Sequence, residues 1–150
     1  MRIVLQRVSS AQVTIHGRIA GQIGRGLLIL VGIENTDTEA DGEWLAKKAV
    51  SLRIFPDEAE RMSQSVADIG GGILLISQFT LHASTQKGAR PSFNAAARPE
   101  HAQPLYEKFI TQLAGALGRP IATGEFGAMM QVALLNDGPV TLVLDSKLRE

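Results

Sequence analysis

The chain of 150 residues contains no cysteine, which excludes a disulfide framework, an iron–sulfur site and a thiol nucleophile. No apolar run approaches the roughly 18 residues that a membrane-spanning helix requires. Residues 1–7 lack the long apolar segment of a signal peptide and instead predict a first strand. We therefore expect a cytoplasmic protein that does not bind membranes.

An excess of either charge is also missing, because 15 basic residues balance 15 acidic ones. Proteins that coat nucleic acid usually carry a strongly basic surface, so we expect no DNA partner. Zero net charge is still compatible with a protein that grips one tRNA end through a few local phosphate contacts.

Side chains for metal or triad chemistry are scarce. His16, His82 and His101 lie far apart without the spacing of paired ligands, so we expect no metal and no cofactor. Ser77 lacks the Gly-x-Ser-x-Gly elbow of serine hydrolases and has no histidine or acidic partner in its segment. Thr80 would need an activating base to act as a nucleophile, and the sequence offers no obvious one.

The composition, 45% hydrophobic and 20% charged, predicts one compact domain over residues 1–150 with a substantial core. Two main helices are predicted, one beginning at Thr38 with a capping-box spacing to Asp41, and one from Pro99 that stops at Gly118. Strands in runs beside two helices indicate an α+β domain with mostly antiparallel or mixed sheets, rather than alternating parallel βαβ units. The predicted strands are 3–5, 13–15, 18–20, 27–33, 73–78, 121–123, 129–135 and 140–144, with polar loops at 57–65 and 82–94.

Two polar segments stand beside apolar runs. Segment 77–81, Ser-Gln-Phe-Thr-Leu, ends the run 73–76, and a buried strand with polar side chains at its tip is a common way to present a site. Segment 136–141, Asn-Asp-Gly-Pro-Val-Thr, lies between two strand-like runs, where Asp-Gly by default predicts a hairpin turn. The following Pro139 is unusual, because it removes a ladder donor where the second strand would begin. Either segment alone favours ordinary architecture.

Together, in this order, the two segments closely resemble those of the D-aminoacyl-tRNA deacylases. The resemblance runs the full length of the chain, from Met-Arg-Ile-Val-Leu-Gln-Arg-Val at 1–8 to the last strand, with further matches at 24–28, 87–93 and 123–128. It implies the deacylase-like fold, a homodimer, and hydrolysis of the ester between a D-amino acid and the 3′-terminal adenosine of tRNA.

The resemblance also implies how few catalytic side chains are needed. The vicinal 2′-hydroxyl of the adenosine can assist the attack of water, so the protein has to position the ester and stabilise its oxyanion. Backbone N–H groups around Phe79 and Thr80 are the expected oxyanion donors. Gln78 is expected to hydrogen-bond the adenosine end, and Ser77 to support the turn.

Further residues match family positions for substrate binding. Phe126 and Met130 match the adenine pocket, although Met130 could equally be ordinary core. Lys87 and Arg90 belong to a basic loop directly after the signature strand, which suits a polyanionic substrate. Two departures concern the tRNA contacts: Met129 stands where family members often carry Asp, and the loop 82–86 has fewer charges than expected.

Gly138 and Pro139 match the family's chiral selector, a cis peptide that one subunit inserts into the other's site. Its two carbonyls would face the substrate's α-carbon, so an L side chain collides while a D side chain points to solvent. Glycine esterified to tRNA should also be accepted, because it has no side chain to collide. Arg7 matches a position expected to hydrogen-bond this loop, and Asn136 belongs to the same supporting set.

Two other functions remain open from the residues. An amidase or peptidase acting on free D-amino-acid derivatives would need a stronger catalyst for a stable amide, and no metal ligands or triad are visible. A non-catalytic RNA-binding module would need stacking platforms or a basic face. Five Phe, one Tyr and one Trp, mostly at core spacing, do not supply them. We therefore expect an ester hydrolase.

Overall fold

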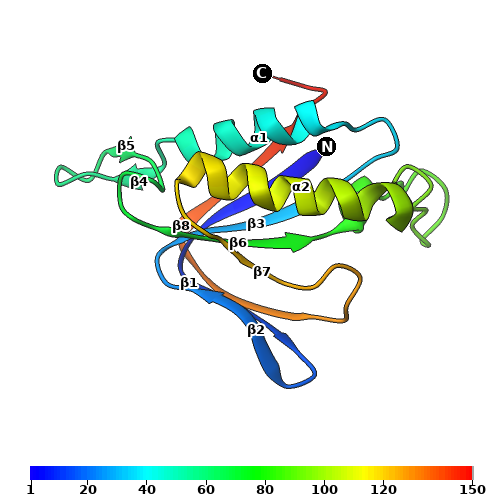
Figure 1. Cartoon of the computed structure of the whole chain (residues 1–150), viewed down its shortest axis with the longest axis horizontal. Coiled ribbons are helices and arrows are strands. Elements are labelled where there is room, and N and C mark those ends of the chain that lie inside the picture. The colour runs from blue at the N-terminus through cyan, green and yellow to red at the C-terminus, as the bar shows by residue number, and fades with distance from the viewer. Residues whose placement is uncertain (150) are drawn as a thin grey trace.

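One curved mixed sheet carries two helices on one of its faces (Figure 1). The structure, a computed structural model, describes residues 1–149. The strand order is β2-β1-β3-β6-β7, and β8 pairs with the other side of β1. The elements are β1 (Arg2–Ile15), β2 (Arg18–Ile23), β3 (Gly26–Gly32), α1 (Glu39–Ser51), β4 (Phe55–Pro56), β5 (Met62–Gln64), β6 (Gly72–Ser77), η1 (Phe79–His82), α2 (Pro99–Leu117), β7 (Ala122–Thr123) and β8 (Gln131–Asp145).

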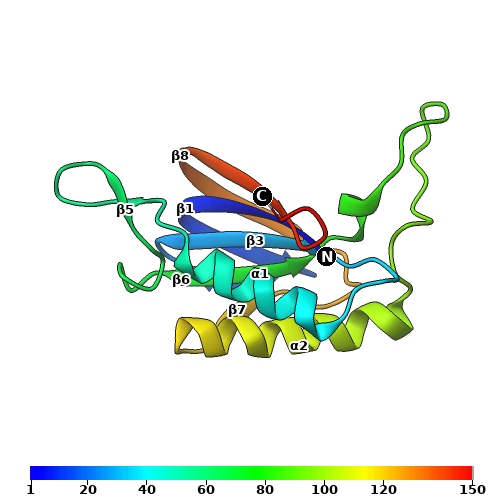
Figure 2. The ribbon, with the colours of Figure 1, turned by 90° about the horizontal axis from the view of Figure 1, so that it is seen from above.

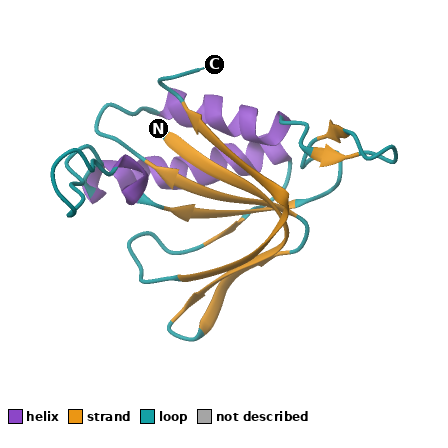
Figure 3. Cartoon of the chain, turned by 180° about the vertical axis from the view of Figure 1, so that it is seen from behind, coloured by secondary structure: helices purple, strands orange, loops and turns teal. Residues whose placement is uncertain are grey.

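The central strands β3 and β6 are buried on both faces, which explains their unbroken apolar sequences. Leu27 and Ile29 of β3 pack with the helices, whereas Leu28 packs in a second cluster on the opposite face. Figure 2 shows α1 and α2 together on one side of the sheet, and Figure 3 shows the opposite side. Within residues 1–149, no helix combines the length and apolar character required to cross a membrane.

The sheet curls until its ends nearly meet. A Cβ on Gly21 of β2 would lie only 2.7 Å from the Thr123 carbonyl oxygen of β7, so the two strands approach through backbone. The second apolar cluster, with Val8, Val13 and Leu74 among its members, fills the inside of this curl. The sheet is therefore mixed and almost closed.

The predicted helices and the mixed sheet are confirmed, but several strand predictions need correction. The Thr38 N–H donates to the Asp41 carboxylate at 2.8 Å, and Gly118 ends α2 at a φ of 84°. However, β3 and β6 pair in parallel across α1, and β6 and β7 pair in parallel across α2, so the sheet does contain parallel crossovers. The predicted loop 57–65 includes strand β5, which pairs with β4.

Strand β8 is one continuous strand, so the predicted pair of strands joined by an Asp-Gly hairpin turn is wrong. Both apolar runs pair with β1, which at 14 residues is long enough to accept them in succession. Gln6 pairs with Thr141 and Val8 with Asn136. An advance of five residues along β8 therefore corresponds to an advance of two residues along β1. The extra residues, within 137–140, leave the ladder as a bulge.

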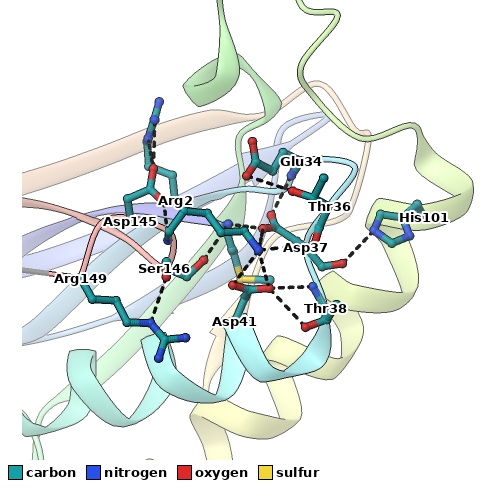
Figure 4. A network of polar contacts seen from close by, with 12 residues as sticks. Arg2, Glu34, Thr36, Asp37, Thr38, Asp41, His101, Asp145, Ser146 and Arg149 are labelled. Atoms are coloured by element: carbon teal, nitrogen blue, oxygen red, sulfur yellow. Dashed lines mark hydrogen bonds and ion pairs between the residues drawn. The ribbon is translucent and has the colours of Figure 1, made fainter.

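The N-terminal ammonium is buried between the start of β1 and the chain after β8. Figure 4 shows the polar network around it, with Asp37, Asp41 and Ser146 labelled. It donates to the Asp37 carboxylate and, at 2.9 Å, to Ser146 Oγ, while Lys147 Nζ lies 3.2 Å from Asp41. Burial opposes ionisation of Asp41, but hydrogen bonds, led by that from Ser146, outweigh burial and hold the pKa of Asp41 well below its usual range. This network joins the two ends of the described chain.

Replacing Asp37 by Ala would leave the buried ammonium of Met1 without a counter-ion. Breaking a buried ion pair by removing one partner typically costs about 3–5 kcal/mol, so we expect Asp37→Ala to lower the free energy of unfolding by that order in urea. Glu43→Ala removes the exposed pair with Lys47 and is the matched control, with a nearly unchanged midpoint. Equal midpoints for both variants would contradict this role of Asp37.

Candidate active site

Segment 77–81 forms a turn at the carboxyl edge of the sheet. Ser77 is the last residue of β6, and Gln78 leads into the short 3-10 helix η1. The Gln78 N–H donates to the Val31 carbonyl at 2.7 Å, which ties the turn to β3. Phe79 and Thr80 are both exposed, so the turn faces solvent in the single chain.

The turn presents free backbone donors. Within residues 1–149, the amide N–H groups of Phe79 and Thr80 have no hydrogen-bond acceptor, whereas the Leu81 N–H donates to the Gln78 carbonyl at 3.2 Å. Two adjacent free amides can donate to one developing negative charge, which is the chemistry of an oxyanion hole.

The same turn holds no activated nucleophile. Gln78 Nε2 donates to Thr80 Oγ1 at 2.5 Å, so the Thr80 hydroxyl receives a proton donor rather than a base. His82 is buried, and its Nε2 has no partner in the part of the chain that the structure describes. The described residues also include no group of three or more His, Cys, Asp or Glu side chains arranged to hold a metal ion.

A long loop, residues 83–98, projects beside the turn (Figure 2). Its base is joined to the turn by Phe93, whose ring meets that of Phe79 edge to face with centroids 5.0 Å apart. Lys87 and Arg90 are exposed on this loop. The loop thus carries two cations out into solvent from a base that contacts the turn.

The segment after β7 reaches the same edge, because β7 runs parallel to β6. The Phe126 ring lies 5.6 Å from that of Tyr106 and packs against the helix-side core. Met130 packs against the inner cluster instead. Both are partly buried, and they pack against different apolar clusters.

Segment 136–141 contains the bulge of β8, which two side chains hold. Arg7, only 8% exposed, donates from Nε to the Asp137 carbonyl at 2.8 Å and from Nη1 to the Ile54 carbonyl at 2.6 Å. Asn136 Oδ1 accepts from the Val140 N–H at 2.9 Å and closes the bulge from within. The tip of the bulge is therefore fixed by its base.

Gly138 and Pro139 form that tip, and both are exposed. The peptide bond between them is cis. A Cβ on Gly138 would lie 2.6 Å from the Val140 nitrogen, so the backbone folds back too closely to admit a side chain. The tip presents main chain and a proline ring to its surroundings.

The turn and the bulge lie at opposite ends of the sheet. Asn136 is level with Val8, Gly26 and Gly72 across the strands, and Ser77 lies five residues farther along β6. This places the two about 16 Å apart along the strand direction alone. Figure 1 shows the bend of β8 at the end opposite the tip of β6. One chain therefore does not bring Gly138 and Pro139 to its own turn.

Exposed apolar side chains lie on and next to β8. Its outer edge has no strand partner among residues 1–149. A hollow of about 340 Å³ opens between β1, β2 and β8, away from the turn. Unpaired edges and contiguous exposed apolar side chains are typical of surfaces that another chain covers. The exposed apolar residues here are Met129, Val132, Leu134, Leu135 and Val143.

A family model described as D-Tyr-tRNA(Tyr) deacylase matches residues 4–145. The chain belongs to this family. Proteins named D-aminoacyl-tRNA deacylase from Opitutus terrae and Bacteroides thetaiotaomicron are 62% and 59% identical to it over 150 residues, which is 100% of each chain.

Solved structures agree in fold with this deacylase family member. One described as c-Myc DNA Unwinding Element Binding Protein is 43% identical with a TM-score of 0.91, and the match covers 97% of this chain and 98% of that one. Another, described as "a probable eukaryotic D-amino acid tRNA deacylase", has a TM-score of 0.83 at 17% identity and covers 96% and 98%. The second likeness shows the fold alone.

Three residues around the turn, Gly32, Arg2 and His82, are not among the site residues that the sequence predicts. Gly32 ends β3, and a Cβ there would lie 2.9 Å from both Leu81 Cβ and His82 Cδ2, so only glycine lets the turn pack on this strand. Arg2 donates from Nη1 to the Leu81 carbonyl at 2.8 Å. Gly32 could have been noticed as a glycine closing an apolar run, whereas nothing local in the sequence marks Arg2 or His82.

Proposed function

We propose that this chain hydrolyses the ester bond between a D-amino acid and the 3′-terminal adenosine of tRNA. The main support is the turn, which offers two free amides, at Phe79 and Thr80, beside the Thr80 hydroxyl, which has no activating base. Such a turn can stabilise an oxyanion but supplies no nucleophile of its own. An aminoacyl ester suits it, because the ester is activated and carries a neighbouring 2′-hydroxyl.

In this mechanism the substrate provides what the protein lacks. Water attacks the ester carbonyl with assistance from the 2′-hydroxyl, and the amides of Phe79 and Thr80 bind the oxygen that becomes negative. Gln78 hydrogen-bonds the adenosine end, Ser77 supports the turn, and Phe126 and Met130 contribute to the adenine pocket once the site is assembled.

The substrate's phosphates need a separate binding surface. Lys87 and Arg90 lie on the loop whose base contacts the turn through Phe93, so they can meet the polyanionic acceptor end. With only local basic residues in a chain of zero net charge, binding is expected to be confined to that end.

The backbone donors can be tested at Phe79, the first residue of η1, because proline has no N–H and is common at the first position of a helix. Removing one oxyanion-hole donor typically costs about 10²–10³ in kcat, so we expect Phe79→Pro to lose that much on D-tyrosyl-tRNA. Phe79→Ala removes the ring but keeps the N–H, and is the matched control. Thr80→Ala should stay within about tenfold of wild type.

A different catalyst would give a different pattern. A trapped acyl-enzyme, or loss of several orders of magnitude in a folded Thr80→Ala variant, would restore a threonine nucleophile. Replacing the terminal 2′-hydroxyl by hydrogen should nearly abolish turnover while leaving binding largely intact. Normal hydrolysis of that substrate would show that the protein carries its own base.

We further propose that two copies form a homodimer in which each inserts Gly138 and Pro139 into the other's site. The separation of bulge and turn within one chain supports this, as does the apolar surface along β8. The inserted main chain would face the substrate's α-carbon and exclude an L side chain, while a D side chain points outward. Selection of this kind does not depend on which side chain the D-amino acid carries.

Backbone selection predicts tolerance of D side chains. D-Tyr, D-Phe and D-Asp esters of tRNA should be cleaved at rates within about tenfold of one another, because their side chains avoid the protein. Glycyl-tRNA should also be cleaved, and L-aminoacyl-tRNAs should survive. Rates measured with purified protein that followed side-chain size would instead locate recognition in a side-chain pocket.

Mixed dimers test the exchange between subunits. Gly138→Ala crowds Val140 and should disable the bulge, whereas Phe79→Pro disables the turn. Because a two-fold dimer would join each turn to the partner's bulge, mixing the two inactive variants should restore about a quarter of wild-type activity. Mixing Gly138→Ala with Gly138→Ala, Phe79→Pro double variants should restore none. Failure of the first mixture, with mixed dimers verified by mass spectrometry, would place turn and bulge in the same subunit's site.

A further inference from the structure

Arg2 joins the end of β8 to the turn. Its Nη1 donates to the Leu81 carbonyl at 2.8 Å. Its Nε and Nη2 each lie 3.0 Å from the Asp145 carboxylate, and Figure 4 shows Arg2 beside Asp145. One planar guanidinium therefore spans two elements that lie 64 residues apart in sequence, since Leu81 belongs to η1 and Asp145 ends β8. A guanidinium has donors enough in fixed directions for both contacts.

Both sides of this bridge are anchored. The preceding residue, Met1, is held by Asp37 and Ser146, and the Ser146 N–H returns to the Met1 carbonyl at 2.9 Å. Asp145 accepts the Lys147 N–H at 2.9 Å. Burial opposes ionisation of Asp145, but these hydrogen bonds, from the Lys147 amide and from Arg2, outweigh it and lower the pKa of its carboxyl group. The carboxylate that orients Arg2 is thus ionised at neutral pH.

The Arg2 contact satisfies a carbonyl at the end of η1. Carbonyls in the last turn of a helix lack intrahelical partners, and a cation there is favourable. Leu81 lies in the last turn of η1, whose first residues carry the free amides of Phe79 and Thr80. Hydrogen bonds therefore hold both ends of η1, from the Gln78 N–H to β3 at one end and from Arg2 to the Leu81 carbonyl at the other.

We propose that Arg2 is a positioning residue that aims the oxyanion donors of η1, with Asp145 holding its guanidinium in place. This rests on the proposed role of the Phe79 and Thr80 amides. If Arg2 had only a structural role, its ion pair would contribute little to the free energy of unfolding, because its side chain is 37% exposed and exposed ion pairs are weak. A positioning Arg2 affects the transition state, because small displacements of donors are costly there.

The test uses Arg2→Ala, Arg2→Lys and Asp145→Asn in the full chain, assayed on D-tyrosyl-tRNA. We expect Arg2→Ala to lower kcat about ten- to hundredfold with KM within about twofold, the pattern of a lost transition-state interaction. Arg2→Lys keeps the charge but cannot contact both Leu81 and Asp145, so its kcat should lie between those of Arg2→Ala and wild type. Asp145→Asn should show a smaller fall in kcat. Lys47→Gln removes an exposed pair far from the turn and is the matched control.

Chemical rescue separates positioning from folding. Added propylguanidinium should raise the kcat of Arg2→Ala while leaving that of wild type and Lys47→Gln unchanged. Unchanged kcat in a folded Arg2→Ala variant, or a fall that tracks the melting temperature and resists rescue, would overturn the proposal. Should Arg2→Ala not fold, a normal kcat in Asp145→Asn overturns it equally. An active wild type with full activity in Phe79→Pro would instead refute the oxyanion role on which the proposal rests.

Discussion

The pairing of β1 with β8 is the constraint on which the rest of the structure depends. β1 is paired on both sides, with β3 and β2 along one edge and β8 along the other. β8 pairs with β1 almost from end to end. The residues of β8 that have no partner in β1 therefore leave the ladder, and they do so around Gly138 and Pro139. The same pairing delivers Asp145 beside Arg2 and Ser146 beside Met1.

The central strands then determine where chemistry can occur. β3, β6 and β7 run in parallel, so their carboxyl ends meet at one edge, where Gln78 begins the turn and Phe126 follows. Crevices at the carboxyl ends of parallel strands are a common place for ligands in α/β sheets. Here the edge is built from backbone: Gly32 has no side chain, and the turn packs on its Cα.

Local sequence predicted much of this and missed what depends on distant partners. The helices at Thr38 and Pro99, the buried strands and the segments at Ser77 and Asn136 all have local signatures, such as caps, apolar runs or turn residues. Asp-Gly between apolar runs predicts a hairpin by default, although Pro139 is unusual in that position. The same residues serve turns and bulges, and the length of β1 decides for the bulge. Asp37 and Arg2 were missed because their partners lie 36 and more residues away.

The part of β8 that follows the bulge restricts which mutations the gene can accept. Between Gly138 and Asp145 the strand turns Leu142 and Leu144 toward the helix-side core and leaves Val143 outside. Losing or gaining one codon in this stretch would reverse that alternation and bring the wrong residue to Arg2. Single-base substitutions on the outer face leave both ends of the strand in place. The outer-face positions of this stretch should therefore vary among relatives while its length stays constant.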